Sequence, residues 1–175
     1  MPSSVSQSTL EYLARRLDEQ AAEFPTSPEA VDPVTLADDI ATLSRHLQHA
    51  VKRTQERFTA PATVHAPERA VLVRLARATA GMAHALGTLA EALAYATTGF
   101  QHEAVPDLAH THPRNDPQVL RMLTAEKYVA ARARLRYTAA DLRTATPLPG
   151  PSAPRTTRPS TLSTVAPQEL RRTRP

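Results

Sequence analysis

Residues 72–100, LVRLARATAGMAHALGTLAEALAYATTGF, decide the fold. Large side chains recur there at alternating steps of three and four, namely Leu72, Leu75, Thr79, Met82, Leu86, Leu89, Leu93, Ala96 and Phe100. A seven-residue apolar repeat forms a seam that packs against other helices at shallow angles. We therefore expect a long helix that opens at Pro67. It ends either near Thr98, with Gly99 as a left-handed cap, or at Glu103.

The small residues of this stretch favour close packing of helices. Between its large residues the stretch is mostly alanine, and Gly81 and Gly87 lie inside the expected helix. A glycine costs roughly 1 kcal/mol relative to alanine in a helix interior. We therefore expect a neighbouring backbone to approach both glycines.

Two helices are expected before this one. The first runs from Thr9 to Phe24, with Ser8 as its cap and Glu11 completing a capping box. The second opens with Asp32 as its cap and runs to about Thr59. Their apolar stripes are Leu10, Leu13, Leu17 and Phe24 in the first, and Leu36, Ile40, Leu43, Leu47 and Phe58 in the second.

A fourth helix opens with Asp116 as cap and Pro117 in the first turn, where a missing N–H is harmless, and runs to about Thr144. Its stripe has fewer large apolar groups than those of the second and third helices, being Leu120, Thr124, Tyr128, Ala131, Leu135, Thr138 and Leu142. We therefore expect it to be the least securely docked of the long helices.

Short connections between helices favour antiparallel neighbours. The sequence thus predicts an all-α protein, an antiparallel up-down four-helix bundle over residues 9–145, with a flexible N-terminus over residues 1–8. Residues 146–175 are rich in Pro, Arg and Thr, which predicts a disordered basic tail. The first helix covers about half the length of the third, which leaves apolar surface of the third helix for a partner.

Several classes of function are disfavoured by composition. The 175 residues include no cysteine, which excludes thiolate metal sites and a cysteine nucleophile. Phosphate-binding and nucleophile-elbow motifs are absent, and only four glycines are available to build them. The carboxylates of Asp38 and Asp39 lie in a helix start that we expect to be solvated, without raised pKa values. We expect no enzyme activity and no cofactor.

Histidines are weighed as metal ligands. His46 and His49 lie three residues apart, and His110 and His112 share a loop. Neither a Glu-x-x-His pair nor a His-Glu-x-x-His motif accompanies them. We expect no functional metal site.

Four arginines of the fourth helix fall on one stripe at about 100° per residue, with Tyr128 at its edge: Arg121, Arg132, Arg136 and Arg143. Guanidinium groups bind phosphates in a bidentate way, so one interpretation is a track for nucleic acid. The other is that these arginines pair with acidic groups of the first two helices or stay solvated. The net charge of +4 does not decide between them.

The leading hypothesis is a non-enzymatic helical interaction module that self-associates or binds a partner helix through coiled-coil seams of the second and third helices. The alternative is an accessory protein that binds nucleic acid electrostatically through its basic fourth helix and tail. No secretory signal, membrane span or small-molecule substrate is evident, and we expect a cytoplasmic location.

Overall fold

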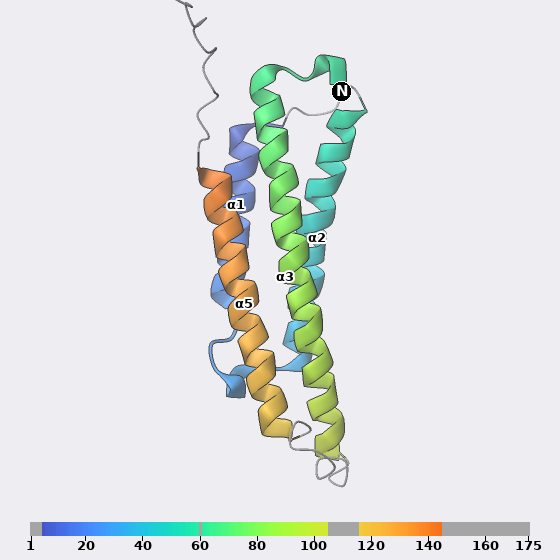
Figure 1. Ribbon diagram of the computed structural model, residues 1–175, viewed down its shortest axis with the longest axis vertical. Coiled ribbons are helices and arrows are strands. Elements are labelled where there is room, and N and C mark those ends of the chain that lie inside the picture. Colours follow the sequence, from blue (N-terminus) through green and yellow to red (C-terminus); the bar gives the residue numbers. More distant parts are fainter. Residues whose placement is uncertain (1–4, 60, 105–115, 145–175) are drawn as a thin grey trace, which may run out of the picture.

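A computed structural model describes residues 5–59, 61–104 and 116–144 of the chain. Within these ranges the secondary structure is helical, without strands. The long helices are α1 (Gln7–Glu23), α2 (Pro33–Phe58), α3 (Ala66–Ala104) and α5 (Pro117–Arg143), and the 3-10 turns are Pro28–Ala30 and Pro61–Thr63. The long helices run alternately up and down as a bundle (Figure 1). The predicted all-α four-helix fold is confirmed, and the predicted tail over 146–175 lies outside the described residues.

The N-terminal end of the bundle differs from the expectation. Helix α1 begins at Gln7, and its N-cap is Ser6 rather than Ser8. Upstream of this cap, Val5 is buried, and its N–H donates to Oε1 of Glu68 at 3.0 Å. This contact anchors the chain before the helix starts, so the helix opens two residues earlier than predicted. Residues 5–8 therefore belong to the bundle and not to a flexible segment.

The starts of α2 and α5 are confirmed. Oδ2 of Asp32 accepts a hydrogen bond from the Thr35 N–H at 2.8 Å, and Oδ1 of Asp116 accepts one from the Gln118 N–H at 2.8 Å. Each bond satisfies an amide that has no partner inside its helix. A proline follows each cap, as expected.

The end of α3 is now settled. The helix continues through Gly99 to Ala104. Gly99 lies inside the helix and does not act as its cap, and a Cβ added there would make ordinary van der Waals contact with Leu120 of α5, 3.5 Å from its Cβ.

Leucines from all four helices form the core, with Leu10, Leu17, Leu36, Leu43, Leu75, Leu89, Leu135 and Leu142 fully buried. Two phenylalanines that the sequence assigned to apolar stripes are exposed instead: Phe58 is 63 % exposed and Phe100 is 69 % exposed. In the last turn of α2, Arg57 takes the inward position beside Phe58. Phe100 lies in the last turns of α3, where it lines a shallow hollow with Val31 and Pro33 at the start of α2.

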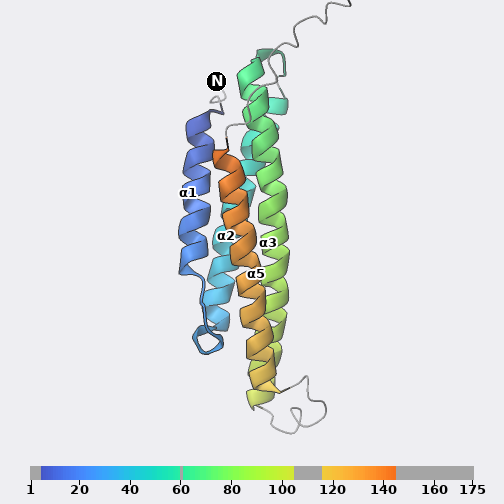
Figure 2. The ribbon, with the colours of Figure 1, turned by 60° about the vertical axis from the view of Figure 1, so that its left-hand side comes forward.

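The expectation that the fourth helix is weakly docked is wrong. Helix α5 packs along α3 and also against α1 (Figure 2). Its buried face includes the small residues Thr124, Ala131, Thr138 and Ala139. Small side chains bring helix axes closer together, so a stripe with few large groups here gives close packing.

Candidate interaction surface

Helix α3 carries a second apolar line of residues on the side that faces away from the core. We call it the outer seam. It consists of Val73, Ala76, Ala80, Ala83, Gly87, Ala90 and Ala94, which are all exposed. Their spacing alternates between three and four residues, as in the buried stripe of the same helix. A helix laid along this line would meet small side chains throughout, with no charged group between Val73 and Ala94 in the line itself.

An apolar groove lies at the α2–α3 end of this seam. It has a volume of about 690 Å³ and is lined by Phe58, Pro61, Val64, Leu72 and Val73, among others. Val73 is 52 % exposed. A second hollow of about 450 Å³ continues along α2 between Val51 and Phe58. The exposed phenylalanine therefore stands between two apolar hollows that no other described part of the chain fills.

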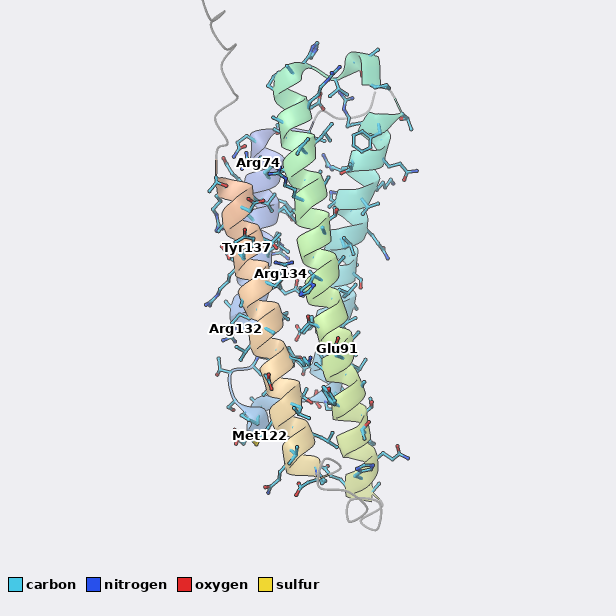
Figure 3. The ribbon with its side chains drawn as sticks, viewed as in Figure 1. Arg74, Glu91, Met122, Arg132, Arg134 and Tyr137 are labelled. Atoms are coloured by element: carbon cyan, nitrogen blue, oxygen red, sulfur yellow. The ribbon has the colours of Figure 1, made fainter. Side chains whose placement is uncertain are left out.

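Charged residues flank the outer seam on the α5 side (Figure 3). Nζ of Lys127 lies 2.6 Å from Oε2 of Glu91, and this lysine holds the pKa of the Glu91 carboxyl below its ordinary value. Arg77 and Arg134 line a hollow with the exposed Tyr137, and neither arginine makes an ion pair within the described ranges. The flank thus has a basic end at Arg77 and an acidic group about four turns further along α3 at Glu91.

The four arginines of the predicted stripe differ in their contacts within the bundle. Arg121 pairs with Glu103, and Nη1 of Arg143 lies 2.5 Å from Oδ2 of Asp18. Arg132 donates hydrogen bonds to the carbonyl oxygens of Phe24 and Pro25, at the C-terminal end of α1. Arg136 is exposed, and no contact partner is found for it among the described residues.

Three of these four side chains are therefore already engaged within the bundle. Arg143 pairs with an acidic residue of α1, as the second interpretation of the stripe expected, whereas Arg121 pairs with one of α3. Tyr128, placed at the edge of the stripe, is fully buried, so it offers no ring to a nucleic acid.

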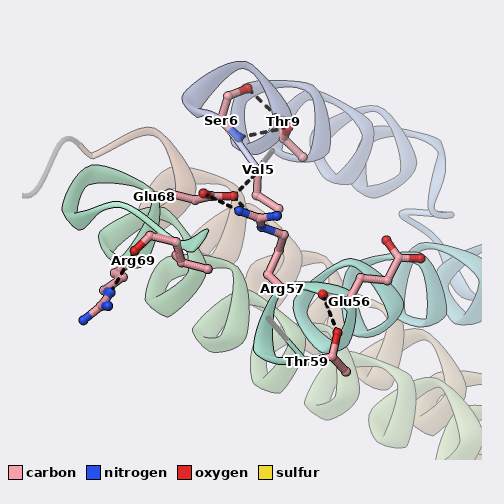
Figure 4. A network of polar contacts seen from close by, with 9 residues as sticks. Val5, Ser6, Thr9, Glu56, Arg57, Thr59, Glu68 and Arg69 are labelled. Atoms are coloured by element: carbon pink, nitrogen blue, oxygen red, sulfur yellow. Dashed lines mark hydrogen bonds and ion pairs between the residues drawn. The ribbon is translucent and has the colours of Figure 1, made fainter. Parts of the chain in front are cut away.

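Sequence reasoning missed a group of buried charges. Arg57 and Glu68 lie on either side of the α2–α3 connection, with Nε of the arginine 2.8 Å from Oε1 and Nη2 2.8 Å from Oε2 of the glutamate (Figure 4). Arg74 is also buried; it donates to Oε1 of Gln7 at 3.0 Å and to the carbonyl of Leu142. No sequence motif predicts that these charged residues are buried, because each is a single interruption of an apolar pattern.

The histidines of α2 line a groove of about 390 Å³ between α1 and α2. His49 accepts a hydrogen bond from Nε of Arg53 at 3.1 Å. Burial and the nearby Arg16 and Arg45 lower the pKa of His46. Over the described residues, no group of three or more His, Asp and Glu side chains could hold a metal ion. His110 and His112 lie outside those residues.

The carboxylates at the start of α2 differ from the expectation of full solvation. Asp39 is half-buried, and burial raises the pKa of its carboxyl above the ordinary value of 3.8. Oδ2 accepts a hydrogen bond from the Tyr128 hydroxyl, which works in the opposite direction and lowers that pKa. The carboxylate thus ties α2 to α5 and does not face an open site.

Comparison with protein-family models, with curated protein sequences and with solved structures found no match to this chain. Across residues 5–59, 61–104 and 116–144, none of the helices combines the length and the apolar character needed to cross a membrane.

Proposed function

We propose that this protein is a non-enzymatic helical interaction module. It associates with another helix, in a second copy of itself or in a partner protein, through the outer seam of α3 and the apolar hollows beside the end of α2. A cytoplasmic location, expected from the sequence, is part of this proposal.

The observation that carries the proposal is the exposed outer seam. It repeats the heptad spacing of the buried face of α3 over three heptads, from Val73 to Ala94. One heptad face packs α3 into its own bundle, and this second one is left for another helix. The hollows around Phe58 extend the apolar surface at one end of the seam.

Electrostatic binding of nucleic acid through the basic fourth helix and the tail remains the alternative proposal. On α5, Arg134 and Arg136 are exposed and make no ion pair in the described part of the chain, so they could bind phosphates. The internal contacts of Arg121, Arg132 and Arg143 would have to break before these side chains could reach a phosphate. The geometry therefore favours the interaction module.

The test compares three full-length proteins: the natural chain, Ala83→Glu in the middle of the outer seam, and Ala133→Glu on the exposed side of α5. Glutamate is a good helix former, so both variants are expected to keep the bundle fold. Each is measured by sedimentation velocity over a concentration series, and by capture from nuclease-treated lysate of the source cells.

We expect the natural chain and Ala133→Glu to associate, with themselves or with a retained protein, and Ala83→Glu to lose that association. A buried glutamate without a partner opposes helix contact strongly. If Ala83→Glu associates as well as the natural chain, or if the natural chain associates with nothing, the proposal is wrong. Capture that disappears on nuclease treatment would support the nucleic-acid alternative.

A further inference from the structure

We propose that the helix received by the outer seam is α3 of a second copy, packed antiparallel to the first about a twofold axis that lies between Ala83 and Gly87 of the seam. This inference rests on the proposed function and specifies its partner.

The register follows from the seam itself. In an antiparallel pair, Val73 faces Thr97 of the second copy, Ala76 faces Ala94, Ala80 faces Ala90, and Ala83 faces Gly87. The same register brings the whole of α3 into overlap, because Ala66 then faces Ala104. The segment of α3 from Val73 to Thr97 alone is about 36 Å long, at ~1.5 Å per residue.

Charges on the flank agree with this register. An antiparallel pair places Arg77 of one copy beside Glu91 of the other, and symmetry repeats the contact. Arg77 has no ion pair within the described residues, and Glu91 remains largely exposed beside Lys127. A parallel pair would instead place the α5-side flank of one copy against the α2-side flank of the other, so Arg77 would not meet Glu91.

Gly87 gives an independent argument. Unlike Gly81, it has no atom within 4 Å of a Cβ built on it in the described structure, so nothing inside the bundle requires a glycine there. An alanine would stabilise the isolated helix, because glycine has a lower helix propensity. In the antiparallel pair, Gly87 lies next to the twofold axis, where two helices separated only by small residues come closest.

The ends of the seam are complementary as well. Exposed Phe100 of one copy reaches the end of the other copy that carries the groove beside Phe58 and Val73. The tail over 146–175 is a poorer occupant for this groove. It carries five arginines and one glutamate, and the groove already has Arg69 and Arg77 in its lining.

The natural chain has no cysteine, so single cysteines report this geometry directly. We would make Ala76→Cys and Ala94→Cys, both at exposed positions, and check their helicity by circular dichroism. Each would be oxidised alone and in an equal mixture at concentrations where sedimentation shows the natural chain to be dimeric. A disulfide requires Cα atoms about 4.4–6.8 Å apart, so only facing positions are linked.

We expect a covalent dimer in the mixture and none from either variant alone. Linking of Ala76→Cys to itself would indicate parallel helices and overturn the proposal. A dimer that gives no linked product uses another face, which overturns the proposal too. A purified chain that is monomeric at every concentration also overturns it, whereas loss of lysate capture in Ala83→Glu would still support the interaction module.

A charge exchange provides a second measurement. Arg77→Glu should weaken the dimer by roughly three- to tenfold, because two symmetry-related contacts become repulsive. Adding Glu91→Arg to the same chain should recover most of the lost affinity. A double variant no tighter than Arg77→Glu alone would contradict the antiparallel register.

Discussion

The hydroxyl of Tyr128 donates a hydrogen bond to Oδ2 of Asp39 at 2.9 Å. This bond joins α5 to the first turns of α2, across 89 residues of sequence. The ring of Tyr128 is fully buried and packs edge-to-face on Phe24, with centroids 5.2 Å apart. One side chain thereby links the core, the end of α1 and a half-buried carboxylate.

Replacing this tyrosine removes the only hydrogen bond of the Asp39 carboxylate to a side chain found in the described structure. We expect Tyr128→Phe to lower the free energy of unfolding by about 1–3 kcal/mol, because the half-buried acceptor loses its donor. Urea unfolding followed by circular dichroism measures the change. Asp39→Asn keeps an acceptor for the hydroxyl and should cost much less; an equal loss in both variants would contradict this explanation.

The raised pKa of Asp39 predicts a particular dependence on pH. Above the ordinary value of 3.8, the folded state holds this proton more tightly than the unfolded state does. The contribution of Asp39 to the free energy of unfolding therefore decreases as the pH rises from 3.8 through the raised pKa. The difference in stability between the natural chain and Asp39→Asn, measured from pH 3 to 7, should shift against the natural chain over that window. A difference that does not vary with pH would show that this pKa is not raised.

Glu68 should behave in the opposite way. Hydrogen bonds from Arg57 and from the Val5 N–H hold the pKa of its carboxyl below 4.5. The unfolded state therefore takes up a proton first, so the stability that Glu68 provides is complete above pH 4.5 and is lost as the pH falls through the lowered pKa.

We expect Glu68→Gln to be less stable than the natural chain at pH 7, because Arg57 stays buried without an anionic partner. The gap should narrow as the pH falls below 4.5. Amide exchange at Val5 should also accelerate in this variant. If Glu56→Gln, an exposed carboxylate of the same region, gave the same pH profile, the assignment to Glu68 would fail.

Two arginines, one buried and one half-buried, close the C-terminal ends of two neighbouring helices. Arg74 donates to the carbonyl oxygen of Leu142 at the end of α5, and Arg132 donates to that of Phe24 at the end of α1. The last carbonyls of a helix have no partner inside it, and the negative end of its dipole favours a cation.

Arg74→Met keeps most of the buried volume but removes these donors. It should destabilise the bundle by about 1–3 kcal/mol and speed amide exchange in the last turn of α5 first. The matched control is Arg134→Met, at an exposed position, which should change stability by less than about 0.5 kcal/mol. Equal effects of the two variants would mean that Arg74 does not act as a cap.

The sequence predicted the helices well because their caps and apolar periods are local. Asp32 and Asp116 each accept a hydrogen bond from an amide two or three residues further on. The leucines of α3 share one face because of the helical period alone. Contacts between distant segments were beyond such reasoning. Whether Arg57 points inward depends on Glu68 and Val5, and the exposure of Phe100 depends on where α2 begins. The outer seam was likewise overlooked, since its alanines are weak signals beside the leucines.

Gly81 and Gly87, two of the three glycines of α3, offer a matched pair of substitutions. A Cβ at Gly81 would lie 3.1 Å from Cγ2 of Thr138 and closer still to its Oγ1, which is held by a hydrogen bond to the carbonyl of Arg134. Gly81→Ala therefore forces α3 and α5 apart, and we expect a loss of about 1–3 kcal/mol from overpacking. Gly87→Ala meets open space and should raise stability by up to about 1 kcal/mol when measured at concentrations where the chain is monomeric. Thermal unfolding of both variants tests this, and the double variant Gly81→Ala with Thr138→Ala should recover part of the loss because both crowded side-chain atoms of Thr138 are gone. If both alanines stabilised the protein equally, helix propensity alone would explain them and α3 would not depend on close contact with Thr138.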